Sequence, residues 1–317
     1  MDVLIETKGL KKYFKTPGGF LHAVDDVNLS IGRGTTLGVV GESGCGKSTL
    51  GRVILRLLEP TRGSIFFEGK NVADFRGKEL KKFRREAQII FQDPYASLNP
   101  RMSVFDLIAE PMIVNRLYQN KEELRERVME LMDTVGLAAR LANSYPHELD
   151  GGRRQRIGVA HALAVNPKFI VCDEPVYALD VSIQAQILNL LMDLQEQRGL
   201  TYMFITHDLS VVRHISDEIA VMYLGQCVEK AEAEELFRNP RHPYTKALLE
   251  AIPVPSLKNR GKTREVLHGE VTNPIEPKPG CRFAPRCRYA CDRCRAEDVK
   301  LRDLGNGHVA ACVLCEN

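Results

Sequence analysis

Two short stretches of the sequence carry residues suited to phosphate chemistry. The first reads GESGCGKST and fits the pattern G-x-x-x-x-G-K-[ST]. In such a loop, backbone N–H groups turn toward a phosphate chain, and the following helix N-terminus adds a positive field. Lys47 offers a positive charge to the outer phosphates, and Ser48 offers a hydroxyl to Mg²⁺. The predicted nucleotide-binding residues are Gly41, Glu42, Ser43, Gly44, Cys45, Gly46, Lys47, Ser48 and Thr49.

The second stretch, FIVCDEP (169–175), ends an apolar run with two acids. Ligands of open α/β sheets bind at the carboxyl ends of the strands, where these acids are expected. Asp173 can hold Mg²⁺ directly or through water, and Glu174 can polarise a water for attack on a γ-phosphate. Two adjacent acids can also be a solvated strand end, but after a phosphate-binding loop the catalytic interpretation is favoured.

A third stretch, LDGGRRQRIGVAHAL (149–163), places two adjacent glycines between Asp150 and a run of bases. Adjacent glycines lose much conformational entropy on folding, so they are unfavourable unless the backbone must approach something closely or adopt a positive φ. We therefore expect a close approach at Gly151 and Gly152.

The surrounding chain alternates between expected strands and helices. Apolar–polar alternation and short apolar runs predict strands at 3–14, 23–31, 36–41, 64–69, 169–175 and 202–208, and a hairpin at 220–231. Helical spacing predicts helices from 47, over 183–197 and at 233–239, and a mostly helical region at 78–127 interrupted by FQDPYASLNP. Alternating strands and helices predict an α/β fold with a parallel sheet covered on both faces.

Composition restricts the class of protein. The 317 residues are 44% hydrophobic and 27% charged, as in soluble globular proteins, and a net charge of +3 gives no case for nucleic-acid binding. No apolar run reaches the roughly 20 residues needed to span a bilayer, and the N-terminus has no signal-peptide pattern. We therefore expect a cytosolic protein that reaches a membrane only through a partner.

Six of the nine cysteines crowd the end of the chain. From about Pro253 the sequence becomes rich in Pro, Gly and Lys, so we expect a linker there and a small module at roughly 265–317. In a reducing cytosol such cysteines bind metal more often than they form disulfides, and their irregular spacing favours a cluster or a non-standard zinc site. Free cysteines in a docking tail are the alternative.

Taken together, the motifs resemble the ATP-binding subunits of ABC transporters. The P-loop, IIFQDP with Gln92, the Gly-Gly stretch, DEP, ALD with Asp180 and ITHD with His207 appear in the family's order over about 3–251. HPYTKALLEAIP and the cysteine tail resemble the oligopeptide/dipeptide (peptide/nickel) importer branch. The resemblance implies a P-loop ATPase domain at 1–252, with a RecA-like core, an antiparallel β subdomain and a helical subdomain at about 95–165. Residues 253–317 would form the linker and the Cys-rich C-terminal module.

The resemblance also implies roles for individual residues. Gln92 would sense the γ-phosphate and Mg²⁺, His207 would contact the γ-phosphate, Asp180 would lie at an interface between ATPase subunits, and Phe14 or Tyr13 would stack on adenine. The implied catalytic residues are Glu174, His207, Gln92 and Lys47, and the Mg²⁺ residues are Ser48, Gln92 and Asp173. In the tail, Cys281, Cys287, Cys294 and Cys312 would hold a [4Fe–4S] cluster, with zinc as the alternative. Cys291 could substitute for Cys294, and Cys315 is an extra cysteine.

The Gly-Gly stretch departs from the family's usual LSGGQ signature, which caps the nucleotide of the opposite subunit. The in-trans residues here are Asp150, Gly151, Gly152 and Arg153. Asp150 replaces a serine and brings a negative charge toward ATP, and Arg153 could offset part of it by pairing. His161 and Tyr177 are further departures. They predict an asymmetric heterodimer; the alternative is that the changes are tolerated and both sites hydrolyse ATP.

The resulting hypothesis is an ATP- and Mg²⁺-dependent ATPase that powers oligopeptide or dipeptide import. Its expected partners are a second, non-identical ATPase subunit, two transmembrane permeases and an extracytoplasmic substrate-binding protein, with no nucleic acid. Its expected place is peripheral, on the cytoplasmic face of the inner membrane. The alternatives are a regulatory or structural nucleotide-binding subunit, an importer of nickel or another solute, and a soluble ABC ATPase of DNA repair or ribosomes. The last class usually carries a coiled-coil insertion or two cassettes, and neither is seen here.

Overall fold

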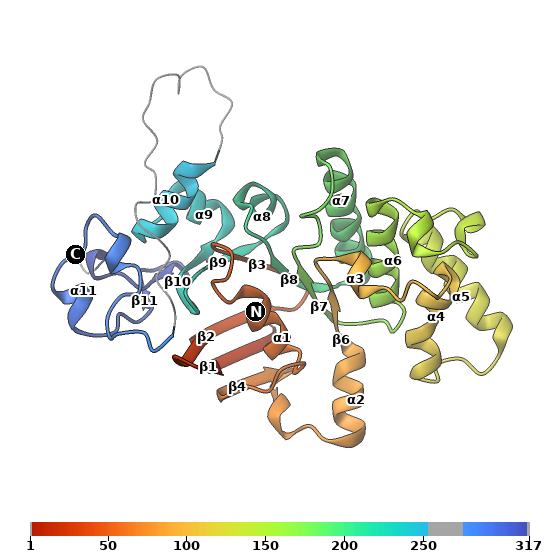
Figure 1. Ribbon diagram of the computed structural model, residues 1–317, viewed down its shortest axis with the longest axis horizontal. Coiled ribbons are helices and arrows are strands. Elements are labelled where there is room, and N and C mark those ends of the chain that lie inside the picture. The colour runs from red at the N-terminus through yellow and green to blue at the C-terminus, as the bar shows by residue number, and fades with distance from the viewer. Residues whose placement is uncertain (1, 253–274, 316–317) are drawn as a thin grey trace, which may run out of the picture. The chain divides into compact units, whose positions relative to one another are not determined.

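The computed structural model describes residues 2–252 and 275–315, which form two compact units (Figure 1). One unit comprises Met1–Ala73 and Phe204–Asn317, as far as these are described, and the other comprises Asp74–Met203. The division falls within strand β8 (Thr201–Ile205). The linker predicted from Pro253 lies outside the described residues.

The first unit begins with an antiparallel sheet in the order β2-β1-β4-β5. From Asp25 to Gly32, the strand β2 alternates between buried residues and more exposed ones, as expected for a sheet with one face on a core. The sheet consists of β1 (Val3–Thr16), β2 (Gly19–Gly32), β4 (Arg62–Phe67) and β5 (Lys70–Asn71). The first three confirm the strands predicted at 3–14, 23–31 and 64–69.

A second set of strands in the first unit runs in the order β11-β12-β10-β9-β3. β3 (Thr36–Val40) and β9 (Glu218–Tyr223) are parallel, and β9 forms the predicted hairpin with β10 (Gln226–Glu232). Before residue 253, the described helices of this unit are α1 (Lys47–Ile54), α8 (Leu209–Ile215), α9 (Ala233–Arg238) and α10 (Pro243–Ala251). The short η1 (Val72–Asp74) begins in this unit and ends at the first residue of the other.

The C-terminal segment, residues 275–315, belongs to the first unit. Its strand β12 (Val309–Ala310) pairs with β10, and β11 (Arg302–Asp303) pairs with β12. Phe283 packs into an apolar core with Tyr223 and Tyr244. Its other elements are η5 (Ala284–Arg286), α11 (Arg293–Ala296) and η6 (Val313–Cys315).

The second unit contains the parallel pair β6 (Ala87–Ile90) and β7 (Phe169–Asp173). The sequence predicted β7 but placed β6 inside a mostly helical region, which is wrong there. Four residues after a strongly polar helix give too short an apolar run to show strand periodicity. The helices are α2 (Gly77–Glu86), α3 (Pro94–Ser97), α4 (Val104–Val114), α5 (Lys121–Thr134), η2 (Ala139–Leu141), η3 (Pro146–Glu148), α6 (Gly151–Leu163) and α7 (Val181–Arg198).

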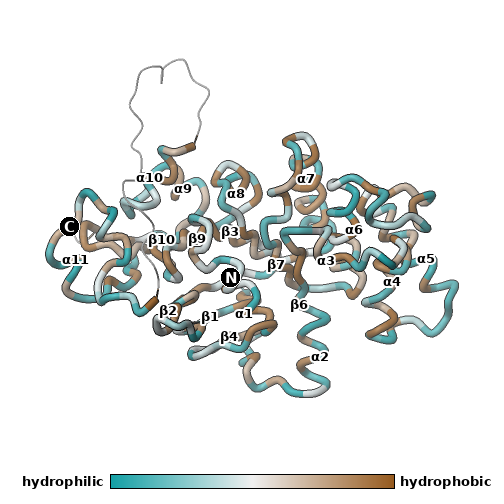
Figure 2. Tube along the Cα trace, in the orientation of Figure 1, coloured by the Kyte–Doolittle hydropathy of each residue, from teal (hydrophilic) through white to brown (hydrophobic). Residues whose placement is uncertain are grey.

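Hydropathy follows this organisation. Figure 2 shows hydrophobic residues along β3 and β9 and hydrophilic residues along α2. All five residues of β3 and all five of β7 are buried, as expected for strands covered on both faces. None of the helices in the described part of the chain has the length and apolar character to cross a membrane.

Candidate functional site

The phosphate-binding loop lies between β3 and α1 of the first unit, where the sequence predicted it. Gly41 and Gly46 have positive φ values of 152° and 105°. A Cβ atom would lie 2.1 Å from the Met222 carbonyl oxygen at Gly41 and 2.0 Å from that of Ala23 at Gly46. Only glycine fits these two positions, because the neighbouring strands press backbone against backbone there.

Lys47 is buried within this loop. Its Nζ donates hydrogen bonds to the Gly41 carbonyl at 2.8 Å and the Glu42 carbonyl at 3.0 Å. A Cβ atom on Gly44 would meet nothing within 4 Å, so the loop is open to a ligand on that side. A buried ammonium held by backbone oxygens beside an open glycine loop fits the phosphates of ATP. Bound ATP with Mg²⁺ supplies the γ-phosphoryl group for transfer to water.

The other predicted loop residues and His207 also belong to the first unit. Ser48 and Thr49 are partly buried in the first turn of α1, whereas Ser43 is exposed and Cys45 is buried. Burial raises the pKa of the Cys45 thiol. His207 is exposed and follows Thr206, whose N–H donates to the Val39 carbonyl at 3.1 Å. The end of β8 is therefore tied to the end of β3, which leads into the loop.

The candidate adenine-stacking residues, Tyr13 and Phe14, are both partly buried in β1. Tyr13 stacks on His22 with ring centroids 3.8 Å apart, and its hydroxyl donates to Asp25. The Lys12 ammonium lies 5.0 Å from the centre of the Phe14 ring. Tyr13 thus has one face covered by His22, and a lysine approaches Phe14.

Asp25 is surrounded by side chains that are positively charged or donate hydrogen bonds. It accepts hydrogen bonds from Tyr13 and His22, and it pairs with Lys11 and Arg282. Burial by itself raises the pKa of Asp25, but the hydrogen bonds from Tyr13 and His22 and the Arg282 charge lower it to about 2. The carboxylate is therefore ionised at neutral pH.

The two predicted acids of the DEP stretch lie in the second unit. Asp173 is buried at the end of β7, and Glu174 follows it with a φ of 48°, in the left-handed region. Gln92 donates from Nε2 to Glu174 Oε2 at 3.0 Å. Non-glycine residues held in this region are strained, and such strain concentrates at functional positions. The structure therefore brings Gln92 and Glu174 together at one strand end.

The altered signature stretch begins α6 in the second unit. Asp150 is the N-cap and accepts from the Arg153 N–H at 2.8 Å, as the usual serine would also do. The Arg153 guanidinium lies 3.3 Å from the same carboxylate, with both side chains about half exposed. A Cβ atom would lie 2.7 Å from Ile183 Cγ2 at Gly152 and 3.1 Å from Leu179 Cδ2 at Gly151. These glycines thus allow close packing against α7 and the turn before it.

The remaining predicted residues near this stretch also have local partners. Asp180 caps α7 and accepts from the Ile183 N–H at 3.0 Å. His161 Nδ1 lies 2.8 Å from the Leu107 carbonyl oxygen. Tyr177 is 59% exposed, so a large aromatic ring lies on the surface just before α7.

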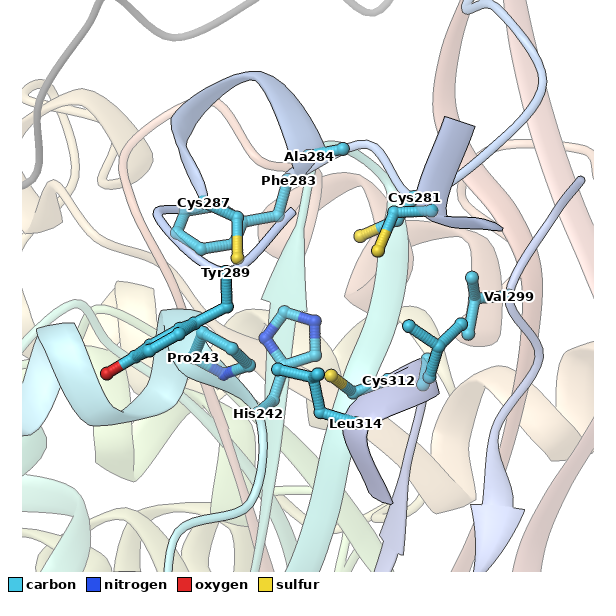
Figure 3. A pocket seen from close by; sticks show the side chains of 13 residues that line it. His242, Pro243, Cys281, Phe283, Ala284, Cys287, Tyr289, Val299, Cys312 and Leu314 are labelled. Atoms are coloured by element: carbon cyan, nitrogen blue, oxygen red, sulfur yellow. The ribbon is translucent and has the colours of Figure 1, made fainter. Parts of the chain in front are cut away.

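Four thiols of the C-terminal segment line one narrow pocket. Figure 3 shows the sulfur atoms of Cys281, Cys287 and Cys312 pointing toward a common space beside the ring of His242. The fourth cysteine is Cys294, and its sulfur lies 3.6 Å from that of Cys291. Burial raises the pKa of Cys281 and Cys287, and that of Cys312 to about 12. Cys315 is not among the lining residues.

Within residues 2–252 and 275–315, no three His, Cys, Asp or Glu side chains are grouped as ligands of a metal ion. The cavity is lined by thiols, which are soft ligands, but it holds no ready-made tetrahedral zinc arrangement. The described residues therefore form no preformed site for either the [4Fe–4S] cluster or the zinc ion expected in the tail.

Comparison with known proteins gives two family matches. The family described as "ABC transporter" matches residues 24–177, and the one described as "Oligopeptide/dipeptide transporter, C-terminal region" matches residues 228–294. The chain belongs to the ABC transporter family. It is an ATP-binding subunit of the oligopeptide/dipeptide type, and it hydrolyses ATP as ABC ATPases do.

Curated relatives match this ABC subunit over nearly its whole length. The oligopeptide transport ATP-binding protein OppF of Bacillus subtilis is 55% identical, with 88% of this chain and 95% of OppF covered. The dipeptide transport ATP-binding protein DppF of Haemophilus influenzae is 48% identical, with 98% of this chain and 96% of DppF covered.

Solved structures confirm the ABC ATPase fold. The ATP-binding cassette MJ0796, in a dimeric post-hydrolysis state with ADP and Pi, is 32% identical with a TM-score of 0.66. The match covers 73% of this chain and 99% of MJ0796. CbiO1 of Clostridium perfringens, part of the complex cbiONQ, is 29% identical with a TM-score of 0.67, covering 75% of this chain and 92% of cbiO1.

Sequence reasoning missed Tyr244 and Arg286, which contact Glu42 of the phosphate-binding loop. It also missed the pair of Asp25 and Arg282, which joins β2 to the C-terminal segment. Three of them come from more than 190 positions beyond the loop, so no local spacing could connect them with it. The available signal was two arginines next to cysteines, in GCRF and PRCR.

Proposed function

We propose that this ABC subunit powers the import of oligopeptides or dipeptides. The observation that supports the hydrolytic part of the proposal is the hydrogen bond from Gln92 to Glu174, whose backbone is held in the left-handed region at the end of β7. Glu174 acts as the general base that polarises water, with Gln92 orienting it, and Lys47 stabilises the developing phosphate charge. With ATP bound, Ser48, Gln92 and Asp173 would hold Mg²⁺, and His207 would contact the γ-phosphate.

The peptide cargo is supported by the printed names of the relatives and by the C-terminal region match. The subunit would work on the cytoplasmic face of the inner membrane, with two permeases and an extracytoplasmic binding protein. The test is reconstitution of the transporter, isolated from detergent-solubilised membranes, into liposomes with labelled di- and oligopeptides. We expect ATP-dependent peptide uptake, and uptake of nickel or another solute in its place would contradict the peptide assignment.

We also propose that the second ATPase subunit is a different chain. The support is the charge at the signature: Asp150 keeps the capping role of a serine but leaves a half-exposed carboxylate at the helix N-terminus. In a homodimer, that carboxylate would face ATP at both sites. Co-purification through a tag on this chain should yield two ATPase chains in equal amounts. Recovery of this chain alone with the permeases would contradict the heterodimer.

For the tail, we propose that Cys281, Cys287, Cys294 and Cys312 hold a [4Fe–4S] cluster. The support is that these four thiols line one cavity, and thiolates are suited to iron–sulfur clusters. The cluster's role would be structural. Iron and sulfide analysis of anaerobically purified protein should show both elements, and Cys312→Ser should remove them while Cys315→Ser should not. Stoichiometric zinc without sulfide would contradict the cluster.

A further inference from the structure

The C-terminal segment reaches the phosphate-binding loop through Arg286. Its guanidinium binds both carboxylate oxygens of Glu42, at 2.7 Å and 3.0 Å, in a bidentate ion pair. The Arg286 side chain is only 5% exposed and lies 5.9 Å from the centre of the Tyr223 ring. Bidentate arginine–carboxylate pairs are strong and directional, and low exposure limits screening by solvent.

The backbone of the same loop residue is held by Tyr244. The Glu42 N–H donates to the Tyr244 hydroxyl at 2.9 Å, and Tyr244 is fully buried. Tyr244 belongs to the HPY motif, whose His242 caps α10 by accepting from the Tyr244 N–H at 3.1 Å. Glu42 is therefore fixed twice by residues from the end of the chain.

A second arginine of the segment makes a parallel contact. Arg282 pairs with Asp25 and donates to the Leu224 carbonyl, and its side chain is 7% exposed. The turn after Leu224 is itself tied to the loop, because the Gly225 N–H donates to the Cys45 carbonyl at 2.8 Å. Asp25 in turn accepts from the hydroxyl of Tyr13, a candidate adenine-stacking residue.

We propose that Arg286 is a positioning residue for ATP binding that neutralises Glu42 inside the phosphate-binding loop. Glu42 directly follows Gly41, so its carboxylate places a negative charge in a loop that must accept a polyanion. The positive charge of Arg286 compensates the charge of Glu42, and the bidentate pair fixes this part of the loop before ATP binds. The C-terminal segment thus contributes to the nucleotide site of its own chain, with Arg282 supporting the strand beside it.

The test is a double-mutant cycle on the full chain, read by equilibrium binding of ATP. Arg286→Gln exposes the Glu42 charge to the phosphates, and we expect about a tenfold rise in the Kd for ATP. Arg286→Gln combined with Glu42→Gln removes both charges, and we expect it to regain most of the lost affinity. Glu42→Gln alone completes the cycle.

Arg288→Gln is the matched control, because Arg288 lies two positions away and contacts the Tyr289 hydroxyl on the surface. We expect it to bind ATP like the unchanged protein. In the assembled transporter, Arg286→Gln should raise the KM for ATP and leave kcat nearly unchanged. An unchanged Kd in folded Arg286→Gln, or a double variant as weak as that single variant, would overturn the proposal. So would an equal loss in Arg288→Gln.

Discussion

The phosphate-binding loop and the signature stretch both begin a helix with glycines, but they are held in different ways. At Gly41 and Gly46 the loop meets backbone atoms of Met222 and Ala23, and residues from the end of the chain fix Glu42. In the signature stretch, Asp150 caps α6 and pairs with Arg153, and the two glycines lie against the side chains of Leu179 and Ile183. A region fixed by distant backbone tolerates little change, whereas a locally capped one can exchange serine for aspartate and keep its helix.

The sharpest test of this difference adds one methyl group to each region. Gly46→Ala puts a Cβ atom 2.0 Å from a backbone oxygen at a φ of 105°, so we expect no measurable ATP binding. Gly152→Ala meets the Cγ2 methyl of Ile183 at 2.7 Å, so this side chain must shift, and we expect a loss of about 1–3 kcal/mol in unfolding free energy. Isothermal titration and urea unfolding measure the two effects.

Gly158→Ala is the control in α6, because its Cβ atom would meet nothing within 4 Å. It should stabilise the helix by up to about 1 kcal/mol. If Gly46→Ala bound ATP normally, the distinction between backbone and side-chain contacts would be wrong.

The next prediction compares the two hydrolysis sites of the proposed heterodimer. Glu174→Gln in this chain removes the proposed general base, and we expect the ATPase rate of the assembled transporter to fall by about 10²–10⁴. The equivalent change in the partner subunit should leave most of the rate, because that partner's site is capped by Asp150. Equal losses from the two changes would show that both sites turn over.

A third prediction concerns Asp25, which pairs with Arg282 of the C-terminal segment. The folded-state pKa of Asp25 is lowered to about 2, so its contribution is complete above the unfolded value near 4 and is lost as pH falls toward 2. We expect Asp25→Asn to reduce the unfolding free energy by about 2 kcal/mol at pH 7. Urea unfolding at pH 7 and near pH 3 measures it, and the difference from the unchanged protein should shrink at the lower pH.

Asp26→Asn is the control for this measurement. Asp26 is the exposed neighbour with a φ of 57°, a conformation that asparagine also adopts, so little change is expected. A deficit of Asp25→Asn that stayed the same at both pH values would contradict the charge-based explanation.

The smallest expected effect comes from restoring the usual signature. Asp150→Ser with Arg153→Gln removes the carboxylate and its partner while keeping an N-cap, so α6 should stay intact. We expect the ATPase rate of the assembled transporter to rise about twofold as the second site becomes active. Asp193→Ser, which makes the same aspartate-to-serine change at an exposed position on α7, should have no effect. An unchanged rate in the signature variant would show that Asp150 is tolerated.

Much of the fold could be predicted because its signals are local. A few consecutive residues are enough to predict β1 and β2, the P-loop and the buried strand β7. The four residues of β6 do not, because they are too few to show a period. The contacts of Tyr244 and Arg286 with Glu42 depend on the packing of Phe283 and the pairing of β12, which no spacing along the chain encodes.

The pairing of β12 with β10 has a consequence for the making of the protein. A ribosome synthesises β10 about eighty residues before β12, and during that interval the β10 edge carries unpaired backbone groups that invite pairing with another chain. The two-residue strands β12 and β11 then cover that edge with a short, blunt end. A chain that stopped before Val309 would keep its phosphate-binding loop but would leave the backbone groups of the β10 edge unpaired. The pairing of β12 with β10 therefore protects the subunit from aggregation.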